Sequence, residues 1–110
     1  MKKLWIDDVR PAPRGYHWLQ STNQALRFIR EHFNEIEEIW LDHDAGVCAS
    51  DGGDFINVLK EMERLVHHIR WKAIYKDVFA TYKFGLHSAN PVGVANMRAI
   101  IEKNNWKEIK

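Results

Sequence analysis

The nine residues IEEIWLDHD, at positions 36–44, decide the fold class of this chain. Their first six letters supply the apolar residues of a strand, and that strand runs directly into Asp42, His43 and Asp44. A shorter apolar segment, Lys3–Ile6, ends on two aspartates in the same way. We therefore expect at least two strands of one sheet to deliver charged side chains where they end.

Helical patterns alternate with strand patterns along the rest of the chain. The expected elements are a strand at 16–20, a helix capped by Ser21 or Thr22, a helix with Asp54 as N-cap, a strand at 80–86, a helix that begins at Asn90-Pro91 and an edge strand at 106–109. Residues 70–79 either extend the second helix or form a separate connection. This alternation predicts an α/β fold with a mostly parallel sheet and helices on both faces. We expect residues 1–110 to form a single domain.

Composition argues against several classes of function. The chain has 110 residues, and 16 Lys and Arg against 15 Asp and Glu give a formal net charge of +1. This balance argues against a protein that binds duplex nucleic acid through many phosphate contacts. No apolar run approaches the ~20 residues that cross a bilayer, so no membrane partner is expected. The single Cys48 favours a reducing, cytoplasmic setting, and the five scattered tryptophans are expected to serve packing.

Acidic residues follow both the strand at 36–41 and the strand at 3–6. In parallel sheets ligands bind beyond the carboxyl ends of the strands, so Asp7, Asp8, Asp42 and Asp44 are expected at one edge. Converging carboxylates repel one another unless a cation or protons neutralise them. Hard divalent ions take carboxylate oxygens, and we expect Mg²⁺ or Mn²⁺ on Asp7, Asp8 and Asp42. The alternative for each acid is a loop carboxylate that caps backbone N–H groups or faces water.

Two histidines accompany these acids. His43 lies between Asp42 and Asp44, and His87 follows the strand at 80–86. Imidazole exchanges protons near neutral pH, so the two rings can act as general base and general acid, with Asp44 assisting. Each histidine can instead fix a loop, and His87 can be a buried strand residue.

Three further residues can bind an anion. Ser88, Asn90 and the free N–H groups at the start of the last helix form a potential phosphate cradle. Asn90 is expected to cap that helix in either case. Arg10 can hold a phosphate oxygen through its guanidinium fork, or can form an internal salt bridge to Asp8 or Asp44. These groups predict a small phosphorylated ligand.

Three motifs resemble those of the cyclic-phosphate-processing receiver-like family. They are LWIDDVRPAP at 4–13, WLDHDAG at 40–46 and HSANPVG at 87–93, with Asn96-Met97 following, and they occur in that family's order. The resemblance implies a three-layer, receiver-like fold of the flavodoxin type. It also implies an acidic, histidine-containing site that processes cyclic phosphates.

The match to ordinary phosphoacceptor receivers is partial. An acidic pair, an acceptor aspartate and the hydroxyl of Ser88 have counterparts in that pattern. Those receivers also need a lysine after the last strand. This chain has no counterpart for it, because Lys107 and Lys110 lie in the tail. His43 and His87 are additions to the receiver pattern. Both departures favour acid–base chemistry over phosphoryl signalling.

Two functions compete, and a third ranks last. The first is a metal-dependent phosphoesterase acting on a cyclic nucleotide or an RNA-end cyclic phosphate, in which His43 activates water and His87 protonates the leaving oxygen, or the reverse. The second is a non-catalytic signalling or binding module that takes a phosphoryl group on Asp42 or binds a cyclic nucleotide. The third is a small phosphatase with Asp42 as nucleophile and Asp44 as acid.

Overall fold

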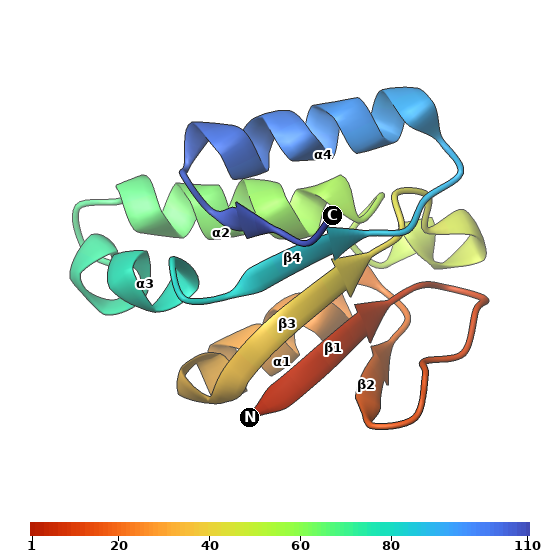
Figure 1. The fold of residues 1–110 in the computed structure, drawn as a ribbon, viewed down its shortest axis with the longest axis horizontal. Coiled ribbons are helices and arrows are strands. Elements are labelled where there is room, and N and C mark those ends of the chain that lie inside the picture. The colour runs from red at the N-terminus through yellow and green to blue at the C-terminus, as the bar shows by residue number, and fades with distance from the viewer.

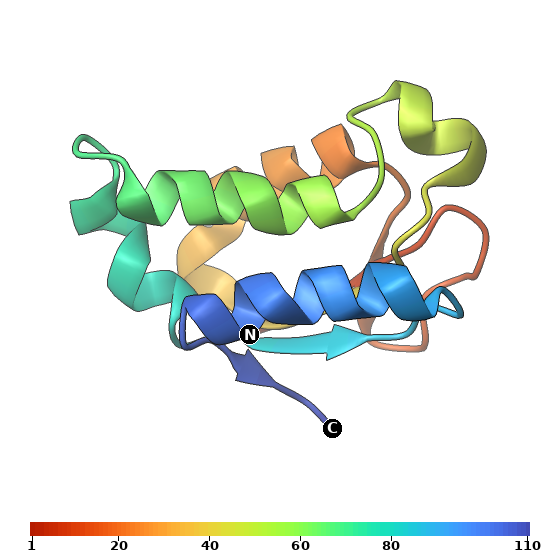
Figure 2. The same cartoon turned by 90° about the horizontal axis from the view of Figure 1, so that it is seen from above.

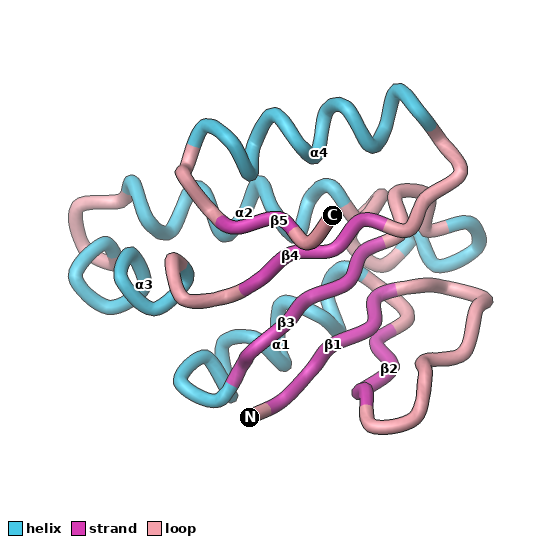
Figure 3. Tube along the Cα trace, in the orientation of Figure 1, coloured by secondary structure: helices cyan, strands magenta, loops and turns pink.

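A computed structural model describes residues 1–110 of the chain (Figures 1 and 3). The strands are β1 (Lys2–Ile6), β2 (Tyr16–Leu19), β3 (Ile36–Leu41), β4 (Lys83–Leu86) and β5 (Lys107–Glu108). The helices are α1 (Thr22–His32), α2 (Ile56–His67), α3 (Lys72–Phe79) and α4 (Pro91–Lys103), with short 3-10 turns η1 (Phe33–Glu35) and η2 (Gly46–Ser50). No helix is long and apolar enough to cross a membrane.

All five strands belong to one sheet in the order β2-β1-β3-β4-β5, and every neighbouring pair is parallel. The predicted α/β fold of the receiver-like, flavodoxin type is therefore confirmed. The carboxyl ends of β1, β3 and β4 meet at one edge, where Ile6 pairs with Leu41 and Leu41 pairs with Leu86. The segments that follow these three strands consequently start side by side.

The structure refines the three-layer expectation in the placement of the helices. The connections from β2 to β3, β3 to β4 and β4 to β5 all step in one direction along the sheet. Right-handed crossovers that step in one direction place their helices on one face. Accordingly α2 contacts both α1 and α4, and the three run side by side (Figure 2). The connection from β1 to β2 is a loop, so no helix from this connection covers the other face.

Alternate strand residues therefore meet two different environments. Leu4 and Ile6 of β1, Ile39 of β3 and Phe84 of β4 point toward the helices and are fully buried. Each such side chain contributes roughly 1.5–3 kcal/mol through removal from water. Their neighbours in sequence point to the face without helices, where aromatic and charged side chains take the place of the buried apolar ones.

Three local predictions can be compared with the helix ends. Ser21 caps α1 by accepting the Gln24 N–H at 3.1 Å, and Asn90 caps α4 by accepting the Gly93 N–H at 3.0 Å. The predicted cap at Asp54 is wrong: α2 begins at Ile56, and the Asp54 carboxylate instead accepts the backbone N–H of Ala45 at 3.1 Å. The preceding loop supplies an unpaired donor, and the carboxylate satisfies it.

Residues 70–79, which the sequence left ambiguous, form a separate connection. The chain leaves the helical conformation at His68, where φ is −83° and ψ is 130°, and α3 then follows. Its aromatic residues explain the break, because Tyr75 and Phe79 turn into the core and pack on one another at 5.1 Å between ring centroids.

The packing of Trp40 over Gly85 gives a direct test of the sheet. Strands β3 and β4 pair these two residues, and a Cβ at Gly85 would collide with the indole ring. We expect Gly85→Ala to lower the free energy of unfolding by about 1–3 kcal/mol. When Trp40 is replaced by Leu, the added Gly85→Ala substitution should cost much less of the free energy of unfolding, because the indole ring is no longer there to collide with. Chemical denaturation of the four proteins measures the coupling, and additive losses would contradict the contact.

Candidate functional site

The acidic and histidine motifs follow β1, β3 and β4 at the carboxyl edge of the sheet. Asp7 comes directly after β1, Asp42 directly after β3, and His87 directly after β4. The register continues past the strands, since Asp42 N–H donates to the Ile6 carbonyl at 2.9 Å and His87 N–H to the Leu41 carbonyl at 3.0 Å. Backbone pairing alone thus aligns the three motifs.

Asp7 is a fully buried carboxylate with a complete set of donors. Its Oδ1 accepts the backbone N–H groups of Val9 at 3.0 Å and Arg10 at 2.8 Å. Its Oδ2 lies 3.1 Å from Nε of Arg10 and 3.2 Å from Nε2 of His87. Burial alone raises the pKa of Asp7, but these donors outweigh it and hold that pKa below its ordinary value. The group is therefore charged at neutral pH.

Asp42 and Asp8 complete an acidic cluster around Asp7. Asp42 is 7% exposed, and its Oδ1 accepts its neighbour's backbone N–H, that of His43, at 2.8 Å. One carboxylate oxygen from each of the three aspartates lies within 4.8 Å of the other two. Gly46 makes room for this cluster, because it has a φ of +54° and a Cβ there would collide with Oδ2 of Asp8. Steric contact with Asp8 thus explains why the motif WLDHDAG ends in glycine.

Arg10 spans two members of this acidic cluster. Its Nε lies 3.1 Å from Oδ2 of Asp7, and its Nη2 lies 3.6 Å from Oδ2 of Asp42. The predicted internal salt bridge therefore exists, but its partners are Asp7 and Asp42 instead of Asp8 or Asp44. The Arg10 side chain is 52% exposed, so it offsets the charge of the two carboxylates from the solvent side.

His87 is held between an aromatic ring and a carboxylate. Its imidazole stacks on Trp5, with ring centroids 3.9 Å apart and an angle of 9° between the planes. Nε2 faces Asp7, while Nδ1 is buried without a hydrogen-bond partner. Burial lowers the pKa of His87, and the nearby charges of Asp7 and Asp42 oppose that shift only in part. A neutral ring that donates from Nε2 to Asp7 accounts for this arrangement.

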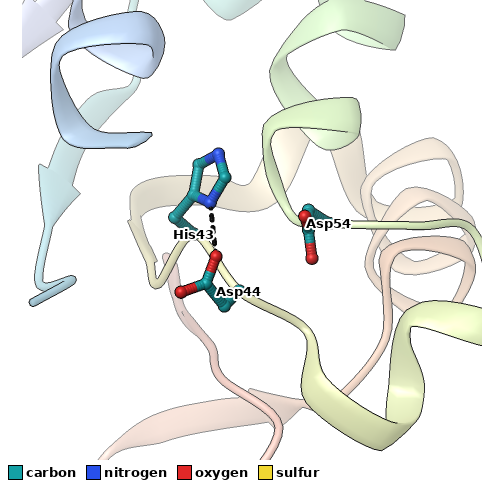
Figure 4. A group of neighbouring side chains, drawn as sticks. All are labelled: His43, Asp44 and Asp54. Carbon is teal, nitrogen blue, oxygen red and sulfur yellow. Dashed lines mark hydrogen bonds and ion pairs between the residues drawn. The ribbon is translucent and has the colours of Figure 1, made fainter. Parts of the chain in front are cut away.

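His43 forms a second group beside the acidic cluster. Its Nδ1 lies 2.7 Å from Oδ1 of Asp44, and the same oxygen accepts the Asn90 side-chain amide at 3.3 Å (Figure 4). The contact to His43 lowers the pKa of Asp44. In Figure 4 the other ring nitrogen, Nε2, points away from both Asp44 and Asp54. An imidazole that donates from Nδ1 keeps a lone pair on Nε2, which is the state required of a base.

The groups of the predicted anion cradle already bond to one another and to Asp44. Ser88 Oγ accepts the backbone N–H of Asn90 at 3.1 Å, and Asn90 caps α4 while donating to Asp44. Asn90 is therefore a cap, as expected, and also a positioning residue for Asp44. Neither of the two cavities of the protein lies at this edge, so the site is an open surface.

Comparison with protein families fits this geometry. The family model of the cyclic-phosphate processing receiver domain matches residues 2–103. The chain belongs to this family. Comparisons with curated proteins and with solved structures gave no match. The family membership predicted from the three sequence motifs is confirmed, and those motifs are the residues that converge at the carboxyl edge.

Sequence reasoning missed three contributors to the site. Asp54 offers a ligand atom within 4.8 Å of those of His43 and Asp44, although it lies ten residues downstream. Gly93 lies against the His43 ring, where any Cβ would collide with the imidazole. Trp5 supplies the surface on which His87 stacks. The sequence signals were the positions of Trp5 within LWIDDVRPAP and Gly93 within HSANPVG, whereas Asp54 lies outside the three motifs because long-range packing leaves no local pattern.

The buried histidine and carboxylate predict how stability depends on pH. The folded pKa of His87 lies below its ordinary 6.5, so only the unfolded chain takes up that proton as the pH falls through 6.5. Stability that is fully present above 6.5 is then lost. Asp7, whose folded pKa lies below 3.8, adds a second loss as the pH falls through its folded value.

Urea unfolding between about pH 8 and pH 5 measures the first of these losses. We expect His87→Gln to flatten the decline, although its absolute stability will be lower. His17→Gln, at an exposed position of β2, should retain the wild-type slope. An unchanged slope in His87→Gln would contradict the assignment of this step to His87.

Proposed function

We propose that this receiver-like domain hydrolyses a cyclic phosphodiester in a reaction that depends on a divalent ion. The observation that carries the proposal is the acidic cluster of Asp7, Asp8 and Asp42, with one oxygen of each within 4.8 Å of the others, next to two histidines. Membership of the cyclic-phosphate processing receiver family supports the substrate class. The ligand is expected to be small, such as a cyclic nucleotide or a cyclic-phosphate end.

The donor set fits a hard divalent cation. Two of the three carboxylates are buried, and the local positive charge that offsets them comes from one half-exposed arginine. Mg²⁺ and Mn²⁺ bind carboxylate oxygens and keep several waters. When bound, such an ion would polarise a phosphate oxygen and offset the charge that develops during ester cleavage.

Proton transfer falls to His43 in this proposal. Asp44 accepts from its Nδ1 and leaves Nε2 with a lone pair that can remove a proton from the attacking water. Asn90 holds the same Asp44 oxygen and so fixes the orientation of the pair. His87 donates from Nε2 to Asp7 in the resting protein. To protonate the leaving oxygen, His87 would have to lose that contact to a ligand and take up a second proton on Nδ1, so that the imidazolium gives up its Nε2 proton and returns to the neutral ring.

In this proposal Arg10 has one role before the ligand binds and another after it. In the resting protein its guanidinium satisfies Asp7 and Asp42. Once those carboxylates have another cation, the exposed guanidinium can turn to an oxygen of the phosphate. Ser88 and the Val92 N–H lie at the same edge and can bind the remaining oxygens, whereas Pro91 has no N–H and Gly93 and Val94 already donate to Asn90.

A panel of cyclic and linear phosphate esters, incubated with and without Mg²⁺ or Mn²⁺, tests the reaction. We expect turnover of a cyclic ester only with the ion, and His43→Gln should lower kcat by about 10²-fold or more, because the general base is lost. Absence of turnover on every ester by folded protein would reject hydrolysis. Incubation with a small phosphoryl donor then tests the alternative: an adduct seen by intact mass and lost in Asp42→Asn would support a signalling module.

Arg10 gives a test that does not need activity. Because the Arg10 guanidinium competes for the acidic cluster, Arg10→Gln should bind Mn²⁺ more tightly, by about fivefold if the competing attraction is ~1 kcal/mol. Asp42→Asn should bind it more weakly than the wild type. Arg14→Gln removes an exposed arginine from the same loop and serves as the matched control. Equal affinities in wild type and Arg10→Gln, measured by calorimetry, would exclude this competition.

A further inference from the structure

We propose that the helix-free face of the sheet is a stacking platform for the unpaired bases of a single-stranded nucleic acid. The platform is defined here as Trp5, Trp18 and Trp40 with the flanking Tyr16, Lys3, Lys83 and Lys107. The inference deepens the proposed function, because it names the kind of molecule that carries the phosphate. It rests on that function only for the position of the strand's end, since binding to the platform requires no turnover.

The pairing of the strands places three tryptophans in one row. Trp5 of β1 pairs with Trp18 of β2 on one side and with Trp40 of β3 on the other. Residues paired in a parallel ladder point to the same face of the sheet. Gly85 of β4 continues the row, and the Trp40 ring lies over it. Tryptophans that are scattered in sequence thus form a continuous aromatic strip across four strands.

This strip is not part of the hydrophobic core. The buried cluster and the apolar residues packed against it include Trp71 and Trp106 but none of the three platform tryptophans. Trp18 is 37% exposed, while Trp5 and Trp40 are half-buried by one another and by their neighbours. The sequence indicates a packing role for all five tryptophans, but only Trp106 lies in the core and only Trp71 packs against it.

The indole N–H groups of the platform are already satisfied within the chain. Trp5 donates to the Arg10 carbonyl at 3.0 Å, Trp18 to the Asp7 carbonyl at 2.8 Å, and Trp40 to Glu38 at 2.9 Å. These bonds fix the rings. His87 covers one face of Trp5 and Trp40 lies over Gly85, so Trp18 offers the most exposed π surface of the three. Every nucleobase has a π face, so such surfaces bind bases with little sequence preference.

The charges around the strip suit a phosphate backbone. Lys3, Lys83 and Lys107 occupy the row next to the tryptophans, because Lys3 pairs with Glu38, Glu38 with Lys83, and Lys83 with Lys107. Only Lys3 has an acidic partner in this row, at 3.9 Å from Glu38. Lys83 and Lys107 are exposed and form no ion pair.

The same composition argues against a protein helix as the occupant. A sheet face that packs against helices carries buried apolar residues without charged neighbours, as the opposite face does with Leu4, Ile39 and Phe84. The helix-free face instead carries a row of aromatic rings beside a row of charged side chains. Aromatic residues interleaved with cations are the pattern by which single strands are bound.

The platform is continuous with the candidate site. His87 stacks on Trp5 and contacts Asp7, and Trp18 donates to the Asp7 backbone carbonyl. A strand whose last bases lie on Trp5 and Trp18 would therefore present its terminal phosphate near Asp7 and Arg10. Stacking explains how a protein with a net charge of +1 can hold such a ligand without many phosphate contacts.

Fluorescence anisotropy with a labelled single-stranded RNA hexamer, in low salt and without divalent ions, tests the platform. We expect saturable binding, with about tenfold or greater loss in Trp18→Leu. Lys83→Gln should weaken binding and reduce its salt dependence. Trp71→Leu and Lys60→Gln, which alter a tryptophan and an exposed lysine of the helical layer, are the matched controls and should bind as the wild type does. Circular dichroism verifies that each variant is folded.

Three outcomes would overturn the inference. They are absence of hexamer binding, equal binding by Trp18→Leu and the wild type, and equal affinity for the hexamer and its duplex. Sedimentation that shows a dimer dissociated by Trp18→Leu would assign the face to a second copy of the chain instead. Hexamer binding without hydrolysis of any ester would reject the proposed reaction and leave the platform intact.

Discussion

The rest of the site depends on the buried carboxylate of Asp7. It receives two backbone N–H groups, a guanidinium and an imidazole, and hydrogen bonds to a charged carboxylate are among the strong ones. The two backbone bonds turn the chain sharply away from β1. That turn brings Arg10 back over Asp42 and fixes the carbonyls that receive the indole N–H groups of Trp5 and Trp18. One interaction therefore shapes both the acidic cluster and the surface beside it.

Much of the fold and the location of the site could be predicted from local patterns. Apolar segments that end on Asp7 and Asp42 indicated two strands, and the rule for the carboxyl ends of parallel strands placed both aspartates at one edge. The Asn90-Pro91 pair marked the start of α4 because capping chemistry is local. The partners of Arg10 could not be predicted, since they depend on which way the turn after β1 folds.

The placement of the helices shows a limit of a different kind. Alternating strands and helices indicate a parallel sheet, but they do not say which face each helix covers. That depends on strand order, which follows from pairing between distant segments such as β1 and β3. Asp54 illustrates the same limit on a smaller scale, because its preference for a helix cap was overridden by the Ala45 N–H of the preceding loop. Tertiary contacts decided both cases.

The loop at residues 7–15 that replaces a helix between β1 and β2 links two properties of the molecule. It leaves the tryptophan row without a covering helix, and it supplies two backbone N–H groups that stabilise the charged carboxylate of Asp7. A descendant that gained a helix at this point would shield the aromatic strip and lose the tight bend in a single insertion. Any lengthening of this loop is therefore expected to alter the aromatic strip and the acidic site together.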